Sequence, residues 1–457
     1  MDLIDIVKQT APYLESWLER QRDFSHTPGV QVAIRVGDEL GASFALGSSN
    51  LRTGAGLTTA HLFHIASHSK TFTATAVMQL VEAGRLRLDD AVEQWIEELA
   101  GSPMARVTVR ELLGHQSGVN RDGSDSDYWQ LDGDFPDRDG VLAFAREQAV
   151  FEPNQHFKYS NIGYSLLGLV SEAVSGQSYK DYVIEHIVDP LGLVSTGPEV
   201  PAGRRGELAG AHGIRLDAAD ERAVIDDVPS NAEAAATGFY STAEEVTRYL
   251  ACHSFSRDEL LSDASKRLMQ RRESRITRGG ERFYGLGFQM VEVNGRMLVG
   301  HSGGWPGHIT QSWLDAESGL CVSVLTNTLG GPASQWATQI VRLLDRIVEA
   351  EGPGPAEVPE GIDPTSFTGR YCCLWGIEDI ALLGTRLYAI PASSTTPHED
   401  ASVLKVVDDC TLRAEPEDSY GATGEDYLFT RDAHGRVRSV RQGGMTSWPE
   451  EAWRERH

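Results

Sequence analysis

The chain has few cysteines, and they form no regular set. Five cysteines occur in 457 residues, an odd number, and no two of them are spaced as CxxC. Disulfide frameworks use even, regularly spaced cysteines, and structural zinc sites commonly use closely spaced pairs. The sequence therefore predicts neither a disulfide scaffold nor a structural zinc site.

Basic residues are scarce relative to acidic ones. Lys and Arg total 41 against 66 Asp and Glu, which gives a net charge of −25. Long-range repulsion then opposes binding to the phosphates of nucleic acid and to anionic lipid. We expect no nucleic-acid partner.

Long hydrophobic runs are also missing. No stretch approaches the about 18 apolar residues that a membrane-spanning helix needs. The N-terminus, MDLIDIVKQTAPYLESWLERQ, has no basic segment followed by an apolar run, so it is not typical of a secretory signal. Its apolar residues follow helical spacing instead. We expect a cytoplasmic protein without a membrane partner, beginning with an amphipathic helix.

The apolar pattern that is present predicts a large α/β (α+β) protein. Alternation in residues 30–36 and 42–47 predicts a β-hairpin, helical periodicity dominates residues 70–275, and strand patterns return over residues 284–327. Strands at both ends with helices between them predict one antiparallel sheet flanked by helices, with an inserted helical region. A cleft between the sheet and that region would be a natural site.

Two local signals refine this pattern. Ser241 followed by Glu244 predicts a capping box at the start of a helix. The Pro- and Gly-rich residues 351–364 are typical of a linker, which would separate a main domain, residues 1–350, from residues 365–457. The last segment has short alternating runs and predicts a small antiparallel β-barrel. Three roles are open for it: shaping the cleft entrance, mediating a homodimer, or stabilising the fold.

Residues 61–70, HLFHIASHSK, offer two kinds of chemistry, of which metal binding is the first. His61, His64 and His68 are three and four positions apart. The hydrolytic zinc motif, however, needs Glu directly after the first His of its pair, and Ile65 follows His64. We predict no catalytic metal and no cofactor.

The second kind of chemistry is a serine nucleophile with an amine as its base. A helix that starts at Ser67 would place Ser67 and Lys70 on one face, with Cβ atoms about 5–6 Å apart. The positive end of the helix dipole and burial both disfavour a protonated amine, so Lys70 could accept the serine proton. A free backbone N–H at the same end could stabilise an oxyanion.

Two segments farther along the chain support the assignment of Ser67 and Lys70 as a nucleophile and its base. Tyr159 follows Ser67 by ninety-two residues, and together with Asn161 it offers a phenol and a carboxamide just before a predicted helix. Farther on, residues 300–304 read GHSGG after a predicted strand. His115, between Ser67 and Tyr159 in the sequence, is expected to support a buried turn through hydrogen bonds and to take no part in the chemistry.

With these three segments in this order, the chain resembles the serine β-lactamase and penicillin-binding-protein superfamily. The likeness is to the branch that contains class C β-lactamases, D-aminopeptidases, DD-peptidases and esterases, and it covers about residues 25 to 345. Residues 365–457 resemble, in outline, the lipocalin-like barrel of some members. The matching stretches are FHIASHSKTFTATAVMQLVEAG, VTVRELLGHQSGV, FKYSNIGYSLLGLVSEAVSG, DPLGL, GFYSTAEEVTRYL, YGLGF and GHSGGWPGH.

The resemblance implies a role for each site residue. Ser67 would be the acylated nucleophile, Lys70 its proton acceptor, and Tyr159 the group that protonates the leaving group and then activates water. Asn161 would orient the substrate's carbonyl. The edge strand that binds the substrate would contain His301, Ser302 and Gly303. The backbone N–H groups of Ser67 and Gly304 would hold the oxyanion.

The resemblance also implies a substrate class, which two departures modify. Many members carry Lys where this chain has His301, so a neutral imidazole should weaken binding of β-lactam acids. No counterpart of the class A deacylating Glu is identified, which favours a mechanism based on Tyr159. We expect a serine hydrolase acting on small esters or on D-amino-acid amides and peptides. The alternatives are a β-lactamase, a peptide cyclase or acyltransferase, and a sensor that is acylated once.

One rival assignment concerns Ser302. GHSGG also fits G-x-S-x-G, the nucleophile elbow of α/β-hydrolases, in which a strand turns directly into a helix. Here Trp305, Pro306 and Gly307 are followed by an extended segment, so the context does not fit.

Overall fold

The computed structural model describes residues 1–217, 221–277, 281–352, 354–418 and 421–457. The chain forms two compact units: one is Ser25–Ala337, and the other joins Met1–Phe24 to Thr338–His457. The linker and the boundaries expected around it stay a prediction.

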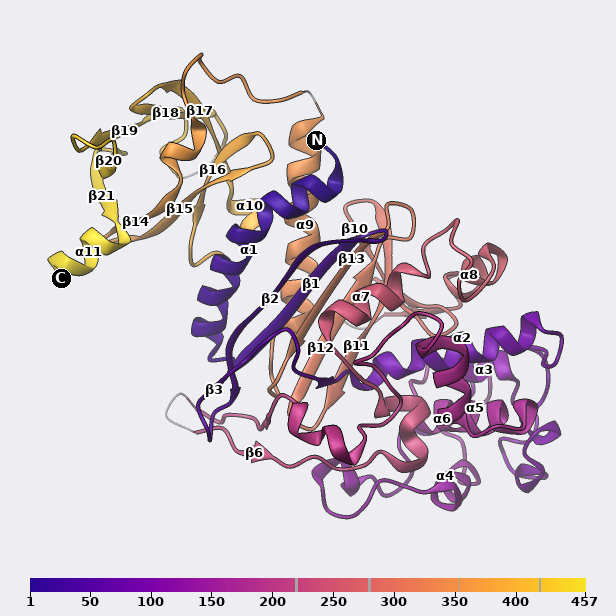
Figure 1. Cartoon of the computed structure of the whole chain (residues 1–457). Helices are drawn as coiled ribbons and strands as arrows, with labels where there is room; N and C mark the ends of the chain where they lie inside the picture. Colours follow the sequence, from indigo (N-terminus) through magenta and orange to yellow (C-terminus); the bar gives the residue numbers. More distant parts are fainter. Residues whose placement is uncertain (218–220, 278–280, 353, 419–420) are drawn as a thin grey trace. The chain divides into compact units, whose positions relative to one another are not determined.

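The larger unit contains a nine-stranded sheet, whose pairings are antiparallel. In spatial order its strands are β3 (Ala55–Gly56), β2 (Glu39–Asn50), β1 (Gly29–Val36), β13 (Leu320–Thr326), β12 (His308–Leu314), β11 (Arg296–Trp305), β10 (Gln289–Val293), β9 (Arg282–Tyr284) and β8 (Ser274–Ile276). β1 pairs with β13 from Val30–Thr326 to Val36–Leu320, so early and late parts of the chain lie side by side (Figure 1). The predicted sheet built from both ends is confirmed.

The inserted helical region is also confirmed. Its helices are α2 (Ser69–Glu82), α3 (Val109–Leu113), α4 (Arg138–Ala145), α5 (Asn161–Ser175), α6 (Tyr179–Val183), α7 (Ala243–Ala251) and α8 (Asp263–Met269). Helix α2 packs on α5, while α7 packs on β1 and β13 (Figure 1). Two small sheets pair β4 (Phe63–His64) with β7 (Tyr240–Ser241) and β5 (Ala211–His212) with β6 (Val224–Ile225).

Helix α5 illustrates how the sequence sets an element's ends. The Ser160 side chain accepts a hydrogen bond from the Gly163 N–H at 2.9 Å, which satisfies a donor that the helix cannot pair itself. Gly176 ends the helix with φ of +75°, a conformation that glycine adopts without steric cost. Every residue from Asn161 to Ser171 is buried except for slight exposure of Leu169, so the helix crosses the interior.

The start of helix α7 differs from the sequence prediction. The capping residue is Thr242, not Ser241, and its side chain accepts from the Glu245 N–H at 3.3 Å. The same spacing of hydroxyl and acid occurs one residue later, so the pattern alone could not choose between them. The carboxylate of Glu245 is occupied by the N–H of Ser195, so it closes no capping box.

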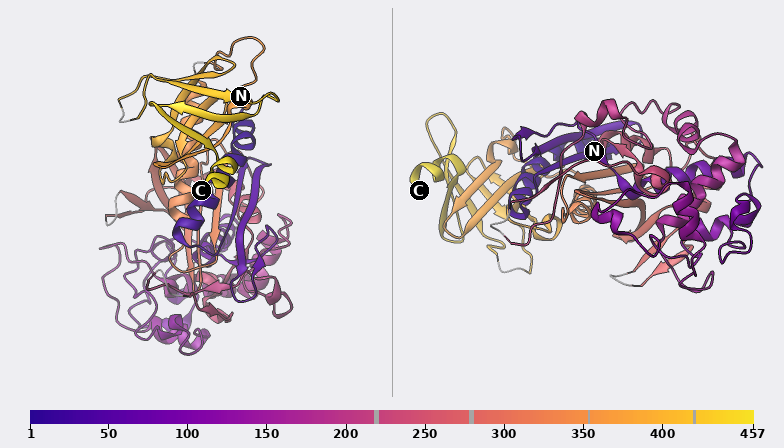
Figure 2. Two further views of the ribbon diagram at one scale, coloured as in Figure 1. Left: turned by 90° about the vertical axis from the view of Figure 1, so that its left-hand side faces the viewer. Right: turned by 90° about the horizontal axis from the view of Figure 1, so that it is seen from below.

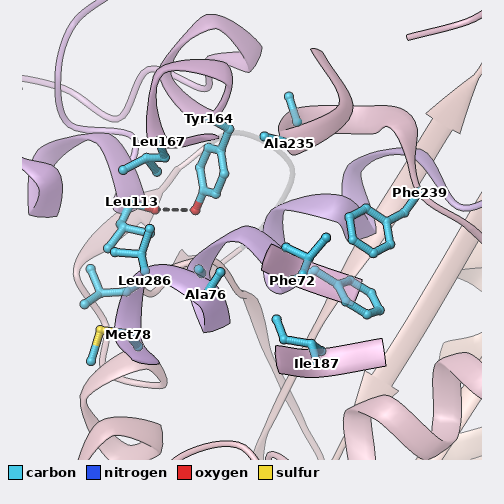
Figure 3. Close-up of a cluster of buried hydrophobic side chains, with 14 of the residues drawn as sticks. Phe72, Ala76, Met78, Leu113, Tyr164, Leu167, Ile187, Ala235, Phe239 and Leu286 are labelled. Atoms are coloured by element: carbon cyan, nitrogen blue, oxygen red, sulfur yellow. Dashed lines mark hydrogen bonds between the residues drawn. The ribbon is translucent and has the colours of Figure 1, made fainter. Parts of the chain in front are cut away.

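The core of the larger unit lies around α2 and α5. Phe72 of α2 stacks on Phe239 with ring centroids 4.2 Å apart, and both are fully buried (Figure 3). The hydroxyl of Tyr164 donates to the carbonyl of Leu113 at 2.7 Å, so this buried polar group is paired (Figure 3). These contacts tie α2 to the segment at Phe239 and α5 to α3.

The smaller unit contains a closed eight-stranded antiparallel barrel, which confirms the predicted barrel (Figure 2). β14 pairs with β15 on one side and with β21 on the other, and so closes it. The strands are β14 (Gly369–Cys373), β15 (Gly376–Leu383), β16 (Arg386–Pro391), β17 (Ser402–Asp408), β18 (Thr411–Ala414), β19 (Asp426–Arg431), β20 (Val437–Gln442) and β21 (Met445–Pro449). The unit's helices include α9 (Ala333–Glu351, from Thr338 on), α10 (Pro397–Asp400) and α11 (Glu450–Arg456).

The N-terminal helix α1 (Leu3–Ser25) belongs to this unit up to Phe24. The Trp17 indole N–H donates to the carbonyl of Ser394 at 2.8 Å, and the Gln21 amide donates to the same oxygen at 2.9 Å. The predicted amphipathic helix is thus present. Among the described residues, no helix combines the length and apolarity that crossing a bilayer requires.

Candidate active site

Ser67 and Lys70 meet at the N-terminal end of α2. Ser67 lies in a 3₁₀ turn, Ala66–His68, and the α-helix itself begins at Ser69, two residues later than expected. Ala66 has φ of +49°, a conformation that non-glycine residues rarely adopt and that recurs at functional sites. The Lys70 Nζ nevertheless lies 3.2 Å from the Ser67 Oγ.

The Lys70 amine has two further partners. It donates to Asn161 Oδ1 at 2.7 Å and to the carbonyl oxygen of Ala236 at 2.8 Å. The residue is fully buried, so these contacts replace the water that an amine would otherwise bind. Three acceptors therefore fix the amine beside the serine hydroxyl.

Burial lowers the pKa of Lys70 from its usual 10.5 to about 7. The nearby carboxyl groups of Glu233 and Asp122 raise this pKa in part, and the guanidinium of Arg121 lowers it. A pKa near 7 leaves a substantial neutral fraction at physiological pH, which is the state that can accept a proton.

Tyr159 lies directly before the capping residue of α5. Burial raises the pKa of its phenol above the usual value, while a hydrogen bond with Ser67 lowers it in part. The Lys70 Nζ lies 4.8 Å from the centroid of the Tyr159 ring. The phenol is therefore protonated at neutral pH and lies next to both the Ser67 hydroxyl and the Lys70 amine.

His115 supports this arrangement from beneath, as the sequence suggested. It is buried and has φ of +55°. Its Nδ1 accepts a hydrogen bond from the N–H of Ser160 at 3.2 Å, and its ring centroid lies 4.3 Å from that of Tyr159. The turn thus holds the segment that presents the phenol.

Strand β11 carries the GHSGG segment. It lies between β10 and β12 in the sheet, but its pairing with β10 ends at Gly300, so residues 301–305 have their ladder partner on the β12 side. Ser302 uses Gln289 instead: its N–H donates to the Gln289 Oε1 at 3.2 Å, and its Oγ accepts from the Nε2 at 3.0 Å. Gly304 is exposed on this strand. The expected edge strand is therefore an inner strand. Within the described part of the chain, its second half has no ladder partner on the β10 side.

His301 points into the protein. Its imidazole is fully buried, its Nδ1 donates to the carbonyl of Ser302 at 2.6 Å, and its Nε2 accepts from the Tyr284 hydroxyl at 3.0 Å. Burial holds the pKa of His301 well below its usual value, so the ring is neutral. The side chain supports the strand in this structure and presents no charge to a ligand.

The surroundings of Ser302 do not form a nucleophile elbow. β11 continues to Trp305, and β12 follows from His308 to Leu314 and pairs with it in antiparallel fashion. A strand-to-helix turn is therefore replaced by a hairpin, as the sequence indicated.

The three histidines of residues 61–70 have separate partners. His61 Nδ1 lies 2.8 Å from the Thr58 hydroxyl, and His64 Nε2 lies 2.7 Å from an oxygen of Asp227. His68 Nδ1 donates to the Ile65 carbonyl at 2.9 Å, and burial lowers the pKa of His68 to about 4. Each imidazole thus makes its own structural contact.

Two buried acids close to Lys70 escaped the sequence analysis. An oxygen of Asp122 lies 2.5 Å from Asn161 Nδ2, and Glu233 is fully buried with one oxygen 2.9 Å from the Tyr128 hydroxyl. Burial and the charge of Asp122 raise the pKa of Glu233 to about 7. Nothing in the sequence distinguishes them among 66 acidic residues, except that Asp122 closely follows the stretch VTVRELLGHQSGV.

Comparison with known proteins shows which family the sequence resembles. The protein-family profile described as Beta-lactamase matches residues 14–344. Penicillin-binding protein 4 of Amycolatopsis lactamdurans is 30% identical over 380 residues, which are 78% of this chain and 96% of that protein. D-aminopeptidase of Brucella anthropi is 27% identical over 331 residues, 69% of this chain and 59% of that protein.

A solved structure has the same fold. The octameric penicillin-binding protein homologue from Pyrococcus abyssi matches 96% of this chain and 98% of its own, with a TM-score of 0.66 and 24% identity. The profile match spans most of the chain, and the first relative is matched over nearly its full length. The chain therefore belongs to the beta-lactamase family.

Proposed function

We propose that the protein is a serine hydrolase that works through an acyl-enzyme on Ser67. The observation that carries this proposal is the 3.2 Å contact between Lys70 Nζ and Ser67 Oγ, with the pKa of the amine lowered to about 7. Neutral Lys70 takes the hydroxyl proton as Ser67 attacks an ester or amide carbonyl. Without that transfer the hydroxyl is a weak nucleophile.

The other site residues have complementary roles in this mechanism. The backbone N–H groups of Ser67 and Gly304 stabilise the oxyanion of the tetrahedral intermediate. Tyr159 protonates the leaving group and then takes a proton from the water that releases the acyl group. Asn161 orients the substrate's carbonyl through the second N–H of its carboxamide, while Ser302 and Gly303 align the substrate along β11.

For the substrate, we propose small esters and D-amino-acid amides or peptides, in preference to β-lactams. The name of the D-aminopeptidase relative supports D-amino-acid amides and peptides as substrates. The neutral, buried imidazole of His301 supplies no fixed charge for the carboxylate of a β-lactam acid. The name penicillin-binding protein 4 favours the opposite order, so penicillins belong in the test.

A substrate panel tests this order. Purified protein is assayed with p-nitrophenyl esters, D- and L-phenylalanine amide, and nitrocefin, with Ser67→Ala as the control. We expect steady turnover of the esters and the D-amide that Ser67→Ala abolishes. A kcat/KM for nitrocefin far above those of the esters and amides would reverse the proposed order.

The same assay separates the remaining alternatives. A single burst without turnover would indicate a sensor that is acylated once. Faster product formation when an amine or alcohol is added, with the acyl group recovered on it, would indicate an acyltransferase or cyclase. Self-association to a homodimer stays a separate prediction, which light scattering tests.

A further inference from the structure

The side chain of Asn161 is held at both ends. Its Oδ1 accepts from Lys70 Nζ at 2.7 Å, and its Nδ2 donates to Asp122 Oδ1 at 2.5 Å. All three residues are buried, with exposed fractions of 2% for Asn161, 0% for Lys70 and 8% for Asp122. An ionised carboxylate only accepts hydrogen bonds and an ammonium only donates them. The two partners therefore allow one orientation of the carboxamide.

Asp122 is itself held in place by its neighbours. Its Oδ1 also accepts from the Trp129 indole N–H at 3.2 Å, and its Oδ2 lies 3.1 Å from Arg121 Nε. The Tyr128 hydroxyl lies 3.0 Å from the backbone oxygen of Asp122 and 2.9 Å from Glu233 Oε1. These contacts join the loop that carries Asp122 to the turn at Glu233, and they leave its carboxylate aimed at Asn161.

We propose that Asp122 is a positioning residue for proton transfer from Ser67: its carboxylate orients the Asn161 carboxamide, which in turn holds the Lys70 amine against the serine hydroxyl. This inference rests on the proposed function of Ser67. Asp122 is not a catalytic residue in this scheme, because it reaches the reacting atoms only through Asn161.

The physical need for such a residue follows from the side chains involved. A lysine amine sits on a flexible stem, and its direction is set by the acceptors around it. If the Asn161 carboxamide turned over, its oxygen would face the carboxylate of Asp122, and two acceptors would meet in a buried place. A displacement of about 1 Å at a reacting group can cost about 100-fold in rate.

Asp122 also acts on the amine through its charge. Its carboxylate favours the protonated form of Lys70 and so opposes the effect of burial on the pKa of Lys70. Removing that charge should lower the pKa of Lys70, which extends the neutral amine to lower pH. Glu233, whose pKa the charge of Asp122 raises, would then ionise more readily and offset part of this shift. A residue with a merely structural role would not move the pH dependence of the reaction in this direction.

The test measures covalent labelling of Ser67 by a fluorophosphonate probe, as a second-order rate constant over a range of pH. The variants are Asp122→Ala and Asp122→Asn. The Asn variant keeps an oxygen that accepts from Asn161 but loses the charge. Asp125→Ala is the control, because Asp125 is an exposed acid in the same loop. Thermal unfolding reports whether each variant is folded.

We expect Asp122→Ala to label about 10- to 100-fold more slowly than the wild type. Asp122→Asn should retain most of the rate at high pH, and the rise of its labelling rate with pH should shift to lower pH. Asp125→Ala should match the wild type. If Asp122→Ala does not fold, the pH shift of Asp122→Asn decides the question.

Four results would overturn the inference. Folded Asp122→Ala that labels at the wild-type rate, or Asp122→Asn with an unchanged pH profile, removes the positioning role and leaves the proposed function intact. An increased KM for D-phenylalanine amide with unchanged labelling would assign Asp122 to substrate binding instead. A wild-type protein that is not labelled at Ser67 would overturn the proposed function, and this inference with it.

Discussion

Gly303 on β11 lies so close to the carbonyl oxygen of Ile65 that a Cβ atom on it would be 2.2 Å away. The same Cβ would lie 2.3 Å from the Thr310 Oγ1. Ile65 precedes Ser67 by two residues. The missing side chain therefore sets how closely β11 approaches the turn that carries Ser67.

Replacing Gly303 with alanine should push β11 and this turn apart. The obstacle is a backbone oxygen that no rotamer change can move, so we expect a loss of about 1–3 kcal/mol in the free energy of unfolding. Urea denaturation measures it. Gly304→Ala is the matched control for stability, because its Cβ would lie 3.6 Å from Ile309 Cδ1, an ordinary contact. Equal denaturation midpoints for the two variants would refute the close-approach argument.

The pH dependence of activity should reflect Lys70. Burial lowers the pKa of its amine to about 7. In the proposed mechanism the neutral form is the proton acceptor. We therefore expect kcat/KM for a p-nitrophenyl ester to rise with pH through about pH 7. Lys70→Arg keeps a charge at all these pH values, so it should lose about 100-fold or more. A rise centred near the usual lysine value of 10.5, or an active Lys70→Arg variant, would argue against this role.

Tyr159 should matter most where the leaving group needs a proton. Its phenol has a raised pKa and is protonated at neutral pH, so it can protonate an amine leaving group. Tyr159→Phe should reduce kcat for D-phenylalanine amide by about 100-fold. The loss should be smaller for acylation by a p-nitrophenyl ester, whose leaving group departs as a stable anion. Pre-steady-state bursts measure that step, with Tyr182→Phe as a distant control; equal losses for both substrates would contradict the assignment.

The contact of Trp17 with Ser394 predicts how truncation acts. A chain cut after residue 350 lacks the Ser394 carbonyl, which accepts from the Trp17 indole at 2.8 Å. Helix α1 then loses this hydrogen bond to the rest of its own unit. We expect such a chain to unfold at lower temperature and its tryptophan fluorescence to shift to the red. Trp17→Phe in the truncated chain should remove part of that shift. Unchanged melting and fluorescence would show that α1 does not depend on residues 351–457.

Much of the fold could be predicted from the sequence because local residue patterns determine where its helices and strands form. Alternating residues in β1 and β2, the helical periodicity of α5 and the turn-separated strands of the barrel each specify their element by periodicity and by end signals. The closeness of Ser67 and Lys70 could be predicted for the same reason, since their spacing is local. The start of α7 was misplaced by one residue because Ser241 and Thr242 offer equivalent hydroxyls.

What the sequence could not specify depends on contacts between distant residues. Asp122 is linked to Lys70 only because the fold brings Asn161 to within 2.5 Å of Asp122, and no spacing rule marks that pair. The inward direction of His301 likewise depends on Tyr284, whose hydroxyl meets its ring. The unit that joins α1 to the barrel rests on pairs such as Trp17 and Ser394, which are 377 positions apart.

The most direct test of the central claim is to locate the covalent adduct. The protein is treated with a fluorophosphonate probe, digested, and mapped by mass spectrometry, with Ser67→Ala and Ser302→Ala treated in parallel. The account predicts a single adduct on the Ser67 peptide that disappears in Ser67→Ala and persists in Ser302→Ala. An adduct on Ser302, or labelling that survives in Ser67→Ala, would contradict it.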